Sequence, residues 1–390
     1  MSTIDLEQPA RVRGPVGVDG FVQPRRAAFW LLVVFLVNGA FIVGPLFYDG
    51  WRVVPTTIVL GLLVWGAYTA IPLLFFRWLD LFAQHPPLGF ALAFAWGGLG
   101  ALYLAVPANT AIISALSKTR GPTWPWIAAI AGPSTEELLK VLGVVLLVLI
   151  ARTQFRTILS VVVIGAVVGL GFQVIEDLDY TLNTALSADS ANQVVPVLSM
   201  LFGRGVLSGL WSHTLFTSVA AFGVGYVVAR PRVALARRLA VAIGCFALAW
   251  SFHFLWNSPL LLGAWWTIPL RGVPLLAVGA LLWRLAGREE ASTLSVLAEH
   301  YVHDSQVLTD DERAALASLR RRRALRRAVR RQHGRRAARL YHRLQRAQLH
   351  AVMVHGQYGA GERAQQAELE VKLLRSRYRT TTTRGRVVSA

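Results

Sequence analysis

Eight apolar runs of about twenty residues constrain the fold of this sequence more than any other feature. A helix rises ~1.5 Å per residue and needs about 20 residues to cross ~30 Å of hydrocarbon. The runs cover residues 27–48, 53–76, 88–106, 127–150, 158–180, 206–228, 239–262 and 267–285. The sequence therefore predicts an all-α, polytopic membrane helix bundle of about eight transmembrane helices.

Composition and charge divide the chain into three parts. Hydrophobic residues make up 54% of the chain and charged residues 16%, against roughly 25% charged in soluble domains. Residues 27–286 carry 14 basic and 8 acidic side chains, whereas residues 287–390 carry 22 and 10. We expect a cytoplasmic N-terminal segment over 1–26, a transmembrane bundle over 27–286 and a basic, largely helical cytoplasmic tail over 287–390.

The basic residues of the short loops predict the orientation of the bundle, because Lys and Arg are retained on the cytoplasmic side. With the N-terminus inside, the outer loops hold only four of them, and eleven arginines lie on the inner side. The outer set is Arg52, Lys118, Arg120 and Arg204. An even number of spans then places both termini in the cytoplasm.

The tail begins with a helix-start signal. Thr309 precedes Asp310, and Glu312 follows three residues later, which is the pattern of a capping box. From Arg320 to Arg346 the chain holds 13 arginines, each contributing about 1 kcal/mol when it lies near an anionic membrane surface. We expect this segment to bind anionic lipid headgroups. Without interleaved aromatics or zinc-ligand spacing, a nucleic-acid partner is not expected.

Three ionisable residues lie inside the fourth apolar run, where each costs about 2.5 kcal/mol or more. Glu136 and Glu137 precede Lys140 by four and three residues, so one helical turn brings the ammonium close to both carboxylates. Such a pair of acids suits a general base beside a proton reservoir. The alternative is that the acids and the lysine form an ion pair that neutralises their charges and has no catalytic role.

Further polar side chains occur in the next three runs. The fifth contains Glu176, the sixth His213, and the seventh His253 with Asn257 four residues later on the same helical face. A lone intramembrane histidine is also compatible with a helix–helix hydrogen bond. We expect the two acids that follow Glu176, Asp177 and Asp179, to lie in the outer headgroup zone.

Depth along the helices predicts that these groups meet. At ~1.5 Å per residue, Glu136 and His253 lie about 14 Å from the outer ends of their runs, His213 about 10 Å and Glu176 about 6 Å. All four fall in the same half of the bilayer. The sequence thus predicts one shared polar cavity among the fourth to seventh spans, open to the outside.

At these residues the chain resembles the PrsW family of bacterial intramembrane proteases, relatives of the CAAX prenyl endopeptidases. The resemblance covers about residues 27–285. The matching elements are Glu-Glu-x-x-Lys at Glu136 to Lys140, Phe-x-x-x-Glu at Phe172 to Glu176, the isolated His213, and the His-x-x-x-Asn element from His253 to Asn257. The chain departs from the family where Asp177 replaces the Asn that often follows the second motif.

The resemblance implies proteolysis of membrane-anchored proteins, for example an anti-sigma factor, by a multi-pass protein of the inner (plasma) membrane. Glu136 would activate water, and Glu176 or Glu137 would hold that water and shuttle its proton. His213 and His253 would hydrogen-bond or protonate the tetrahedral intermediate. Asn257 would donate to its oxyanion, and Lys140 would set the charge of the acid pair.

Several alternatives remain open at this point. The preferred mechanism uses no cofactor, but Glu176, His213 and His253 could form a three-ligand zinc site, although the chain has no His-Glu-x-x-His motif. A proton- or ion-coupled transporter would use the same Glu, Lys and His residues, yet no inverted repeat is evident. Axial haem ligation by the two histidines, or a non-catalytic anchor that displays the tail, are further interpretations.

Overall fold

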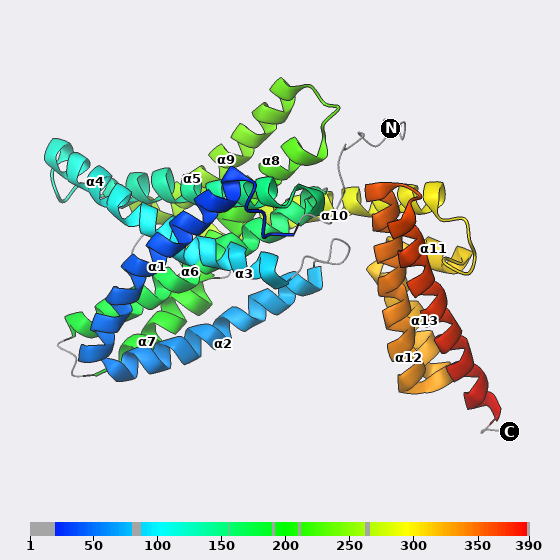
Figure 1. The fold of residues 1–390 in the computed structure, drawn as a ribbon. Coiled ribbons are helices and arrows are strands. Elements are labelled where there is room, and N and C mark those ends of the chain that lie inside the picture. Colours follow the sequence, from blue (N-terminus) through cyan, green and yellow to red (C-terminus); the bar gives the residue numbers. More distant parts are fainter. Residues whose placement is uncertain are drawn as a thin grey trace. The chain divides into compact units, whose positions relative to one another are not determined.

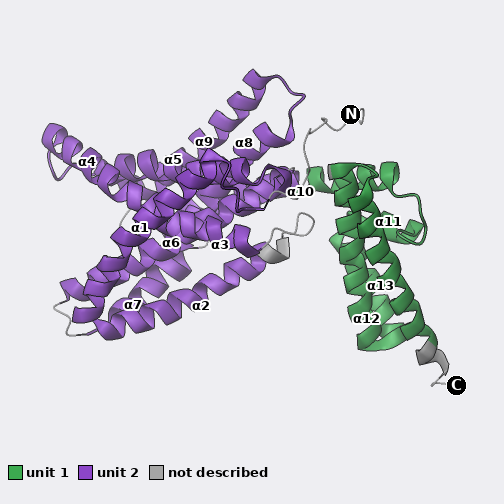
Figure 2. Ribbon diagram, viewed as in Figure 1, with its two compact units in different colours: residues 1–16, 287–390 green, residues 17–286 purple. Residues whose placement is uncertain are grey.

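A computed structural model describes residues 20–79, 87–155, 157–188, 192–209, 212–261 and 266–387. These residues form helices and connecting loops, with no β-strand among them, which confirms the predicted all-α class. The described residues divide into two compact units, those from 20 to 286 and those from 287 to 387 (Figure 2). Most of the segment 1–26, including Arg11 and Arg13, lies outside the described residues.

The first unit is built from long helices (Figure 1). In chain order they are α1 Ala27–Val53, α2 Pro55–Leu79, α3 Pro87–Ala95, the π-helix η1 Trp96–Ala101, α4 Leu102–Arg120, α5 Ile127–Ile150, the 3₁₀ turn η2 Arg152–Gln154, α6 Ile158–Ser187, α7 Val195–Met200, the π-helix η3 Leu201–Ser208, α8 His213–Ala229, α9 Leu235–Asn257, the 3₁₀ turn η5 Pro259–Leu261 and α10 Thr267–Tyr301.

Seven helical stretches of the described chain are long and apolar enough to cross a membrane, where the sequence predicted about eight. The difference is α5, which has 24 residues, enough to span hydrocarbon at ~1.5 Å per residue, but carries Glu136, Glu137 and Lys140. All three of these side chains are buried within the unit. The protein interior therefore shields the charges that make this helix unsuited to face lipid.

Three helical stretches extend well beyond the predicted apolar runs. The third span does not end at Val106 but continues to Arg120. The sixth begins at Val195 rather than 206, so that Arg204 belongs to a helical segment and not to an outer loop. The last, α10, passes the predicted end at residue 285 and runs to Tyr301, with Pro274 inside the helix.

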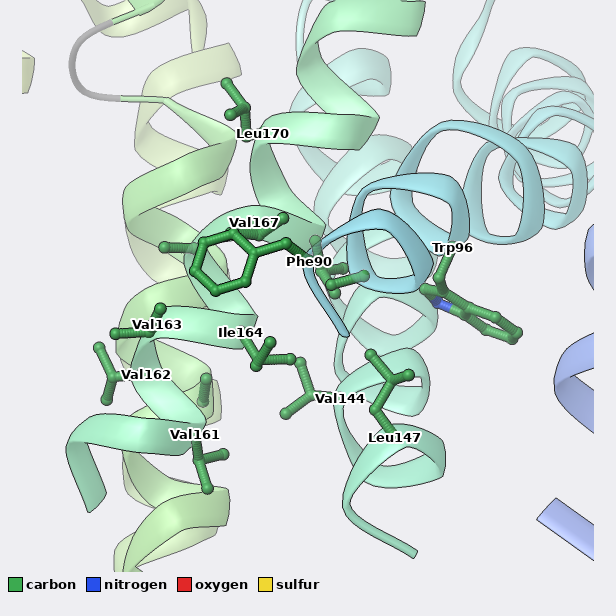
Figure 3. Packing of buried hydrophobic residues seen from close by; sticks show 14 of the residues in the cluster. Phe90, Trp96, Val144, Leu147, Val161, Val162, Val163, Ile164, Val167 and Leu170 are labelled. Atoms are coloured by element: carbon green, nitrogen blue, oxygen red, sulfur yellow. The ribbon is translucent and has the colours of Figure 1, made fainter. Parts of the chain in front are cut away.

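Helix α6 lies in the core of this unit and packs against α2, α3, α5 and α8. Figure 3 shows its side chains from Val161 to Leu170 packed with Val144 and Leu147 of α5 and with Phe90 and Trp96. Gly169 lets α8 approach: a Cβ there would lie 2.3 Å from the carbonyl oxygen of His213. The first residue of α8 is therefore held directly against α6.

The second unit is a helical bundle with its own apolar core. Besides the end of α10 it contains α11 Asp310–Leu316, α12 Leu319–Tyr358 and α13 Glu362–Val387. The predicted capping box is present, with Thr309 Oγ1 accepting from the Glu312 amide and Glu312 Oε2 accepting from the Thr309 amide. Leu344 and Val371 are among its fully buried residues.

Helix α12 is broken at Gly334, whose φ of +78° is a left-handed conformation that favours glycine. Beyond this break Gln345 Nε2 donates to the carbonyl of Arg322, 3.1 Å away. Because these two residues lie at similar distances on either side of Gly334, the two halves of α12 run antiparallel. The arginine-rich segment is thus a helical hairpin and not one straight surface helix.

Candidate active site

The site starts on α5, where one helical turn carries two acids and one lysine. Lys140 Nζ lies 2.7 Å from Glu137 Oε1 and 3.6 Å from Glu136 Oε2. Lys140 and Glu137 are 0% exposed, and Glu136 is 6% exposed. A buried charge is tolerated when it is paired and hydrogen-bonded, so Lys140 makes the two carboxylates possible at this depth.

His253 on α9 is oriented by Glu137. Its Nδ1 lies 2.8 Å from Glu137 Oε1, the same oxygen that accepts from Lys140. The Nδ1 atom must therefore carry the hydrogen, and in the neutral ring Nε2 keeps its lone pair. That free Nε2 lies 3.9 Å from Glu136 Oε2.

His213, the first residue of α8, is engaged on both sides of its ring. Its Nδ1 lies 2.8 Å from Lys140 Nζ, and its Nε2 lies 3.1 Å from Glu176 Oε2 on α6. An ammonium can only donate, so Nδ1 accepts and Nε2–H donates to Glu176. The two histidines face each other at 5.1 Å between ring centroids but have opposite tautomers.

Glu136 has one satisfied and one free oxygen. Asn109 Nδ2 on α4 donates to Glu136 Oε1 over 3.1 Å, and Thr135 Oγ1 donates to Asn109 Oδ1. Glu136 Oε2 is buried and has no hydrogen-bond partner among the described residues. This oxygen also faces His213 Nδ1 at 3.8 Å.

A cavity of about 190 Å³ opens at Glu136, between α4, α5, α6, α8, α9 and η3. Gly132, one turn before Glu136, keeps part of it open: a Cβ there would lie 3.1 Å from Asn257 Nδ2, 3.3 Å from Glu136 Oε1 and 3.8 Å from His253 Nε2. An acid, an imidazole and an amide donor therefore converge around one small space.

A family model described as PrsW family intramembrane metalloprotease matches residues 85–283. The chain belongs to the PrsW family. The match spans α3 to α9 and the first half of α10, so it contains every residue of the cavity. A search of the curated proteins and of the solved structures finds no match.

The seven residues singled out from the sequence of this PrsW-family chain lie in two layers. Five of them line the cavity, and two lie directly behind it. The first layer is Glu136, Glu176, His213, His253 and Asn257, and the second is Glu137 and Lys140. Helices α5, α6, α8 and α9 thus bring together the groups that were predicted from the sequence to lie in the same half of the bilayer.

Besides Asp177, five polar residues of the cavity lining were not singled out from the sequence: Asn109, Tyr180, Arg204, Ser208 and Ser212. Asn109 lies beyond the predicted end of its span, and Arg204 was assigned to an outer loop. Asp177 is 1% exposed, lines the cavity and is bound by Arg204 Nε. Asp179 is half-buried outside the cavity lining and accepts from Asn183 Nδ2. The only feature of the sequence that could have indicated Asn109 and Arg204 is that each is a polar residue close to one end of an apolar run.

Three side chains of the site have donor atoms close enough together to hold one metal ion. Glu136, His213 and His253 each offer one ligand atom, all within 4.8 Å of one another. Glu136 Oε2 has no hydrogen-bond partner among the described residues, and His253 Nε2 has a free lone pair with a carboxylate on Nδ1, as is common for metal-bound histidine. Glu136 thus takes the place that the sequence gave Glu176, which is bound by Arg204.

Proposed function

We propose that this chain is an intramembrane endopeptidase in which Glu136 activates the water that hydrolyses a peptide bond. One observation carries the proposal: Glu136 Oε2 is a buried carboxylate oxygen without a hydrogen-bond partner, at the wall of a cavity. A general base must be within hydrogen-bond reach of the proton it takes. Glu136 lines the cavity, so a water there would lie beside this carboxylate.

The water is held between two acceptors. Glu136 Oε2 and the lone pair of His253 Nε2 are 3.9 Å apart, a separation that one water can bridge with its two hydrogens. Glu136 takes one proton while the water oxygen attacks the carbonyl carbon. Glu137 keeps the His253 ring oriented through Nδ1 and does not touch the substrate.

The remaining steps use groups around the same space. Asn257 Nδ2 donates to the oxyanion of the tetrahedral intermediate, and protonated Glu136 returns its proton to the leaving nitrogen as the C–N bond breaks. The new carboxyl group passes its proton to the amine, so the products are a carboxylate and an ammonium, with one water consumed and Glu136 ionised again. Lys140 keeps both carboxylates paired through the cycle.

A zinc-dependent mechanism is the second candidate, favoured by the description of the family and by the free donor atoms of Glu136 and His253. His213 could join them once its ring releases Lys140 or Glu176. A zinc ion held there would supply a Lewis acid and a more acidic bound water.

Glu136→Gln tests the base. The neutral amide preserves shape, so the variant should fold and insert as wild type does, yet fail to cleave a single-span reporter reconstituted with it. Glu299→Gln, the same change at an exposed acid outside the cavity, should cleave normally. Cleavage by the Glu136 variant at the wild-type rate would exclude Glu136 as the base. The transporter alternative holds if neither wild type nor the Glu136 variant cleaves the reporter, and wild type dissipates a pH gradient that the Glu136 variant maintains.

We further propose a membrane-anchored protein as substrate, an anti-sigma factor being one example, and the inner (plasma) membrane as location, with both termini cytoplasmic. Newly shortened single-pass proteins, found by comparing membrane proteomes with and without the protein, would identify the substrate. Accessibility of single introduced cysteines on either side of the membrane would test the orientation.

We also propose that anionic lipid headgroups bind the arginine-rich hairpin formed by α12, Leu319–Tyr358. Between Glu312 and Glu362 the chain has no acidic residue, and exposed arginines such as Arg327, Arg339 and Arg343 form no ion pair within the described chain. Burial and nearby arginines of both halves of the hairpin lower the pKa of His342, as expected in an uncompensated positive field. The nearby bilayer supplies the missing negative charge.

The lipid proposal is tested on the full chain in lipid nanodiscs. Cleavage by trypsin within the hairpin should be slower in nanodiscs of phosphatidylglycerol than of phosphatidylcholine, and the difference should shrink at high salt. Equal rates, or protection by added RNA alone, would refute a lipid partner.

A further inference from the structure

Arg204 occupies a position in the site that neither the motifs nor the proposed mechanism explain. It lies on the π-helix η3, in the segment that leads to His213, and π-helical turns occur frequently at functional sites. Its side chain is 31% exposed and lines the cavity. Among the described lining residues it is the only lysine or arginine.

The guanidinium clamps two successive acids of α6. Arg204 Nη2 lies 2.5 Å from Glu176 Oε2, and Nε donates to Asp177 Oδ1. Its Cζ lies 4.0 Å from the centroid of the Tyr180 ring, one turn further along α6. Two charged hydrogen bonds and an aromatic face fix the planar group in one orientation, an arrangement that a lysine cannot reproduce.

The clamped oxygen is the one that His213 uses. Glu176 Oε2 accepts from Arg204 and from His213 Nε2, 3.1 Å away. From His213 the contacts continue through Lys140 and Glu137 to His253. Arg204 thus ends a line of hydrogen bonds that reaches the imidazole beside Glu136.

We infer that Arg204 is a positioning residue of the active site, which holds Glu176 against His213 Nε2–H and so fixes the orientation of that ring. This inference rests on the proposed function for its catalytic consequence. Without Arg204 the neighbouring carboxylates of Glu176 and Asp177 would repel each other inside the protein. Glu176 would then turn toward water and release His213 Nε2.

Cleavage kinetics of the reconstituted full chain provide the first test. Losing an outer partner of an active-site group typically costs about 10- to 100-fold in activity, so Arg204→Met should lower kcat by that factor with little change in KM. Arg204→Lys should lower kcat by a smaller factor, because the charge remains. It replaces Arg204→Met in this test if that variant does not insert into the membrane. Arg237→Met is the matched control: Arg237 is exposed on α9, 16 residues before His253, and should have no effect.

A double-mutant cycle separates positioning from a general structural role. If Arg204 acts through Glu176, its replacement should cost less than about 3-fold once Glu176→Gln is present, because groups that act as a unit are not additive. Equal costs in both backgrounds, or a loss confined to KM, would overturn the inference.

The hydrogen bond of His213 Nε2–H to Glu176 gives a readout that does not need cleavage. In ¹⁵N-histidine protein the His213 signals, assigned with His213→Gln, should show a protonated Nε2 in wild type and the Arg237 variant. In Arg204→Met Nε2 should remain protonated, because Lys140 still donates to Nδ1, but its signal should shift as the hydrogen bond to Glu176 is lost. An unchanged His213 signal would refute the role of Arg204 even if the protein cleaves nothing, whereas a shift without any cleavage would contradict the proposed function alone.

Discussion

Lys140 is the residue whose loss should damage the stability of the protein most directly. Its Nζ contacts Glu137 Oε1 at 2.7 Å, His213 Nδ1 at 2.8 Å and Glu136 Oε2 at 3.6 Å, and the side chain is fully buried. Lys140→Met keeps the volume and removes the charge. Because it leaves buried carboxylates without compensation, we expect the free energy of unfolding to fall by about 3–5 kcal/mol.

The loss should be largely reversible by a second change. Glu137→Gln removes one of the uncompensated charges, while its amide oxygen can still accept from His253 Nδ1. The double variant should therefore recover at least half of the lost stability, although it should not regain activity. This recovery distinguishes an electrostatic cost from a packing cost, which a change at Glu137 would not repair.

The assay is reversible unfolding in mixed micelles, followed by the fluorescence of the chain's 13 tryptophans. Lys118→Met is the matched control, because Lys118 is exposed near the end of α4 and should change stability by no more than about 1 kcal/mol. If Lys140→Met is as stable as this control, the buried ion cluster does not exist as described.

Three further predictions concern the cavity. Asn257→Ala should lower kcat by about 10²- to 10³-fold with stability retained, as expected for the loss of an oxyanion donor; cleavage kinetics and thermal unfolding measure the two effects. Gly132→Ala should remove cleavage without destabilising α5, since alanine favours a helix by about 1 kcal/mol over glycine while its Cβ would enter the space near Asn257, Glu136 and His253; full activity would show that this space is not used. Metal analysis of purified protein should show less than stoichiometric zinc, and a chelator should not inhibit; stoichiometric zinc lost together with activity would favour the metal-dependent mechanism.

The apolar runs were sufficient to predict the helices, because burial in lipid or protein demands a continuous hydrogen-bonded segment. They were not sufficient to predict where the helices end. After Val106 the sequence becomes more polar with Pro107 and Asn109, yet α4 continues to Arg120, and Asn109 bonds Glu136 of α5 at the site. The break of α12 at Gly334 was missed for the opposite reason, since one glycine among arginines does not interrupt a compositional pattern.

The motif residues could be found from the sequence because an ionisable group inside an apolar run is expensive and therefore conspicuous. Arg204 and Asp177 escaped this reasoning. Each lies close to an apparent end of its run, where a charged side chain is equally consistent with the headgroup zone. Only the fold reveals that η3 returns Arg204 toward α6, so that the two charges pair at the wall of the cavity.

The sequence also could not separate the roles of the two histidines, which stand in similar surroundings on neighbouring spans. The difference comes from what occupies each Nδ1 atom. Glu137 accepts from His253 and leaves its Nε2 free toward Glu136, whereas Lys140 donates to His213 and leaves Nε2–H directed at Glu176. One ring is thereby available to a water, and the other is committed to linking Arg204 with the lysine. The roles of the two rings follow from which neighbour donates and which accepts, and that depends on how α5, α6, α8 and α9 pack.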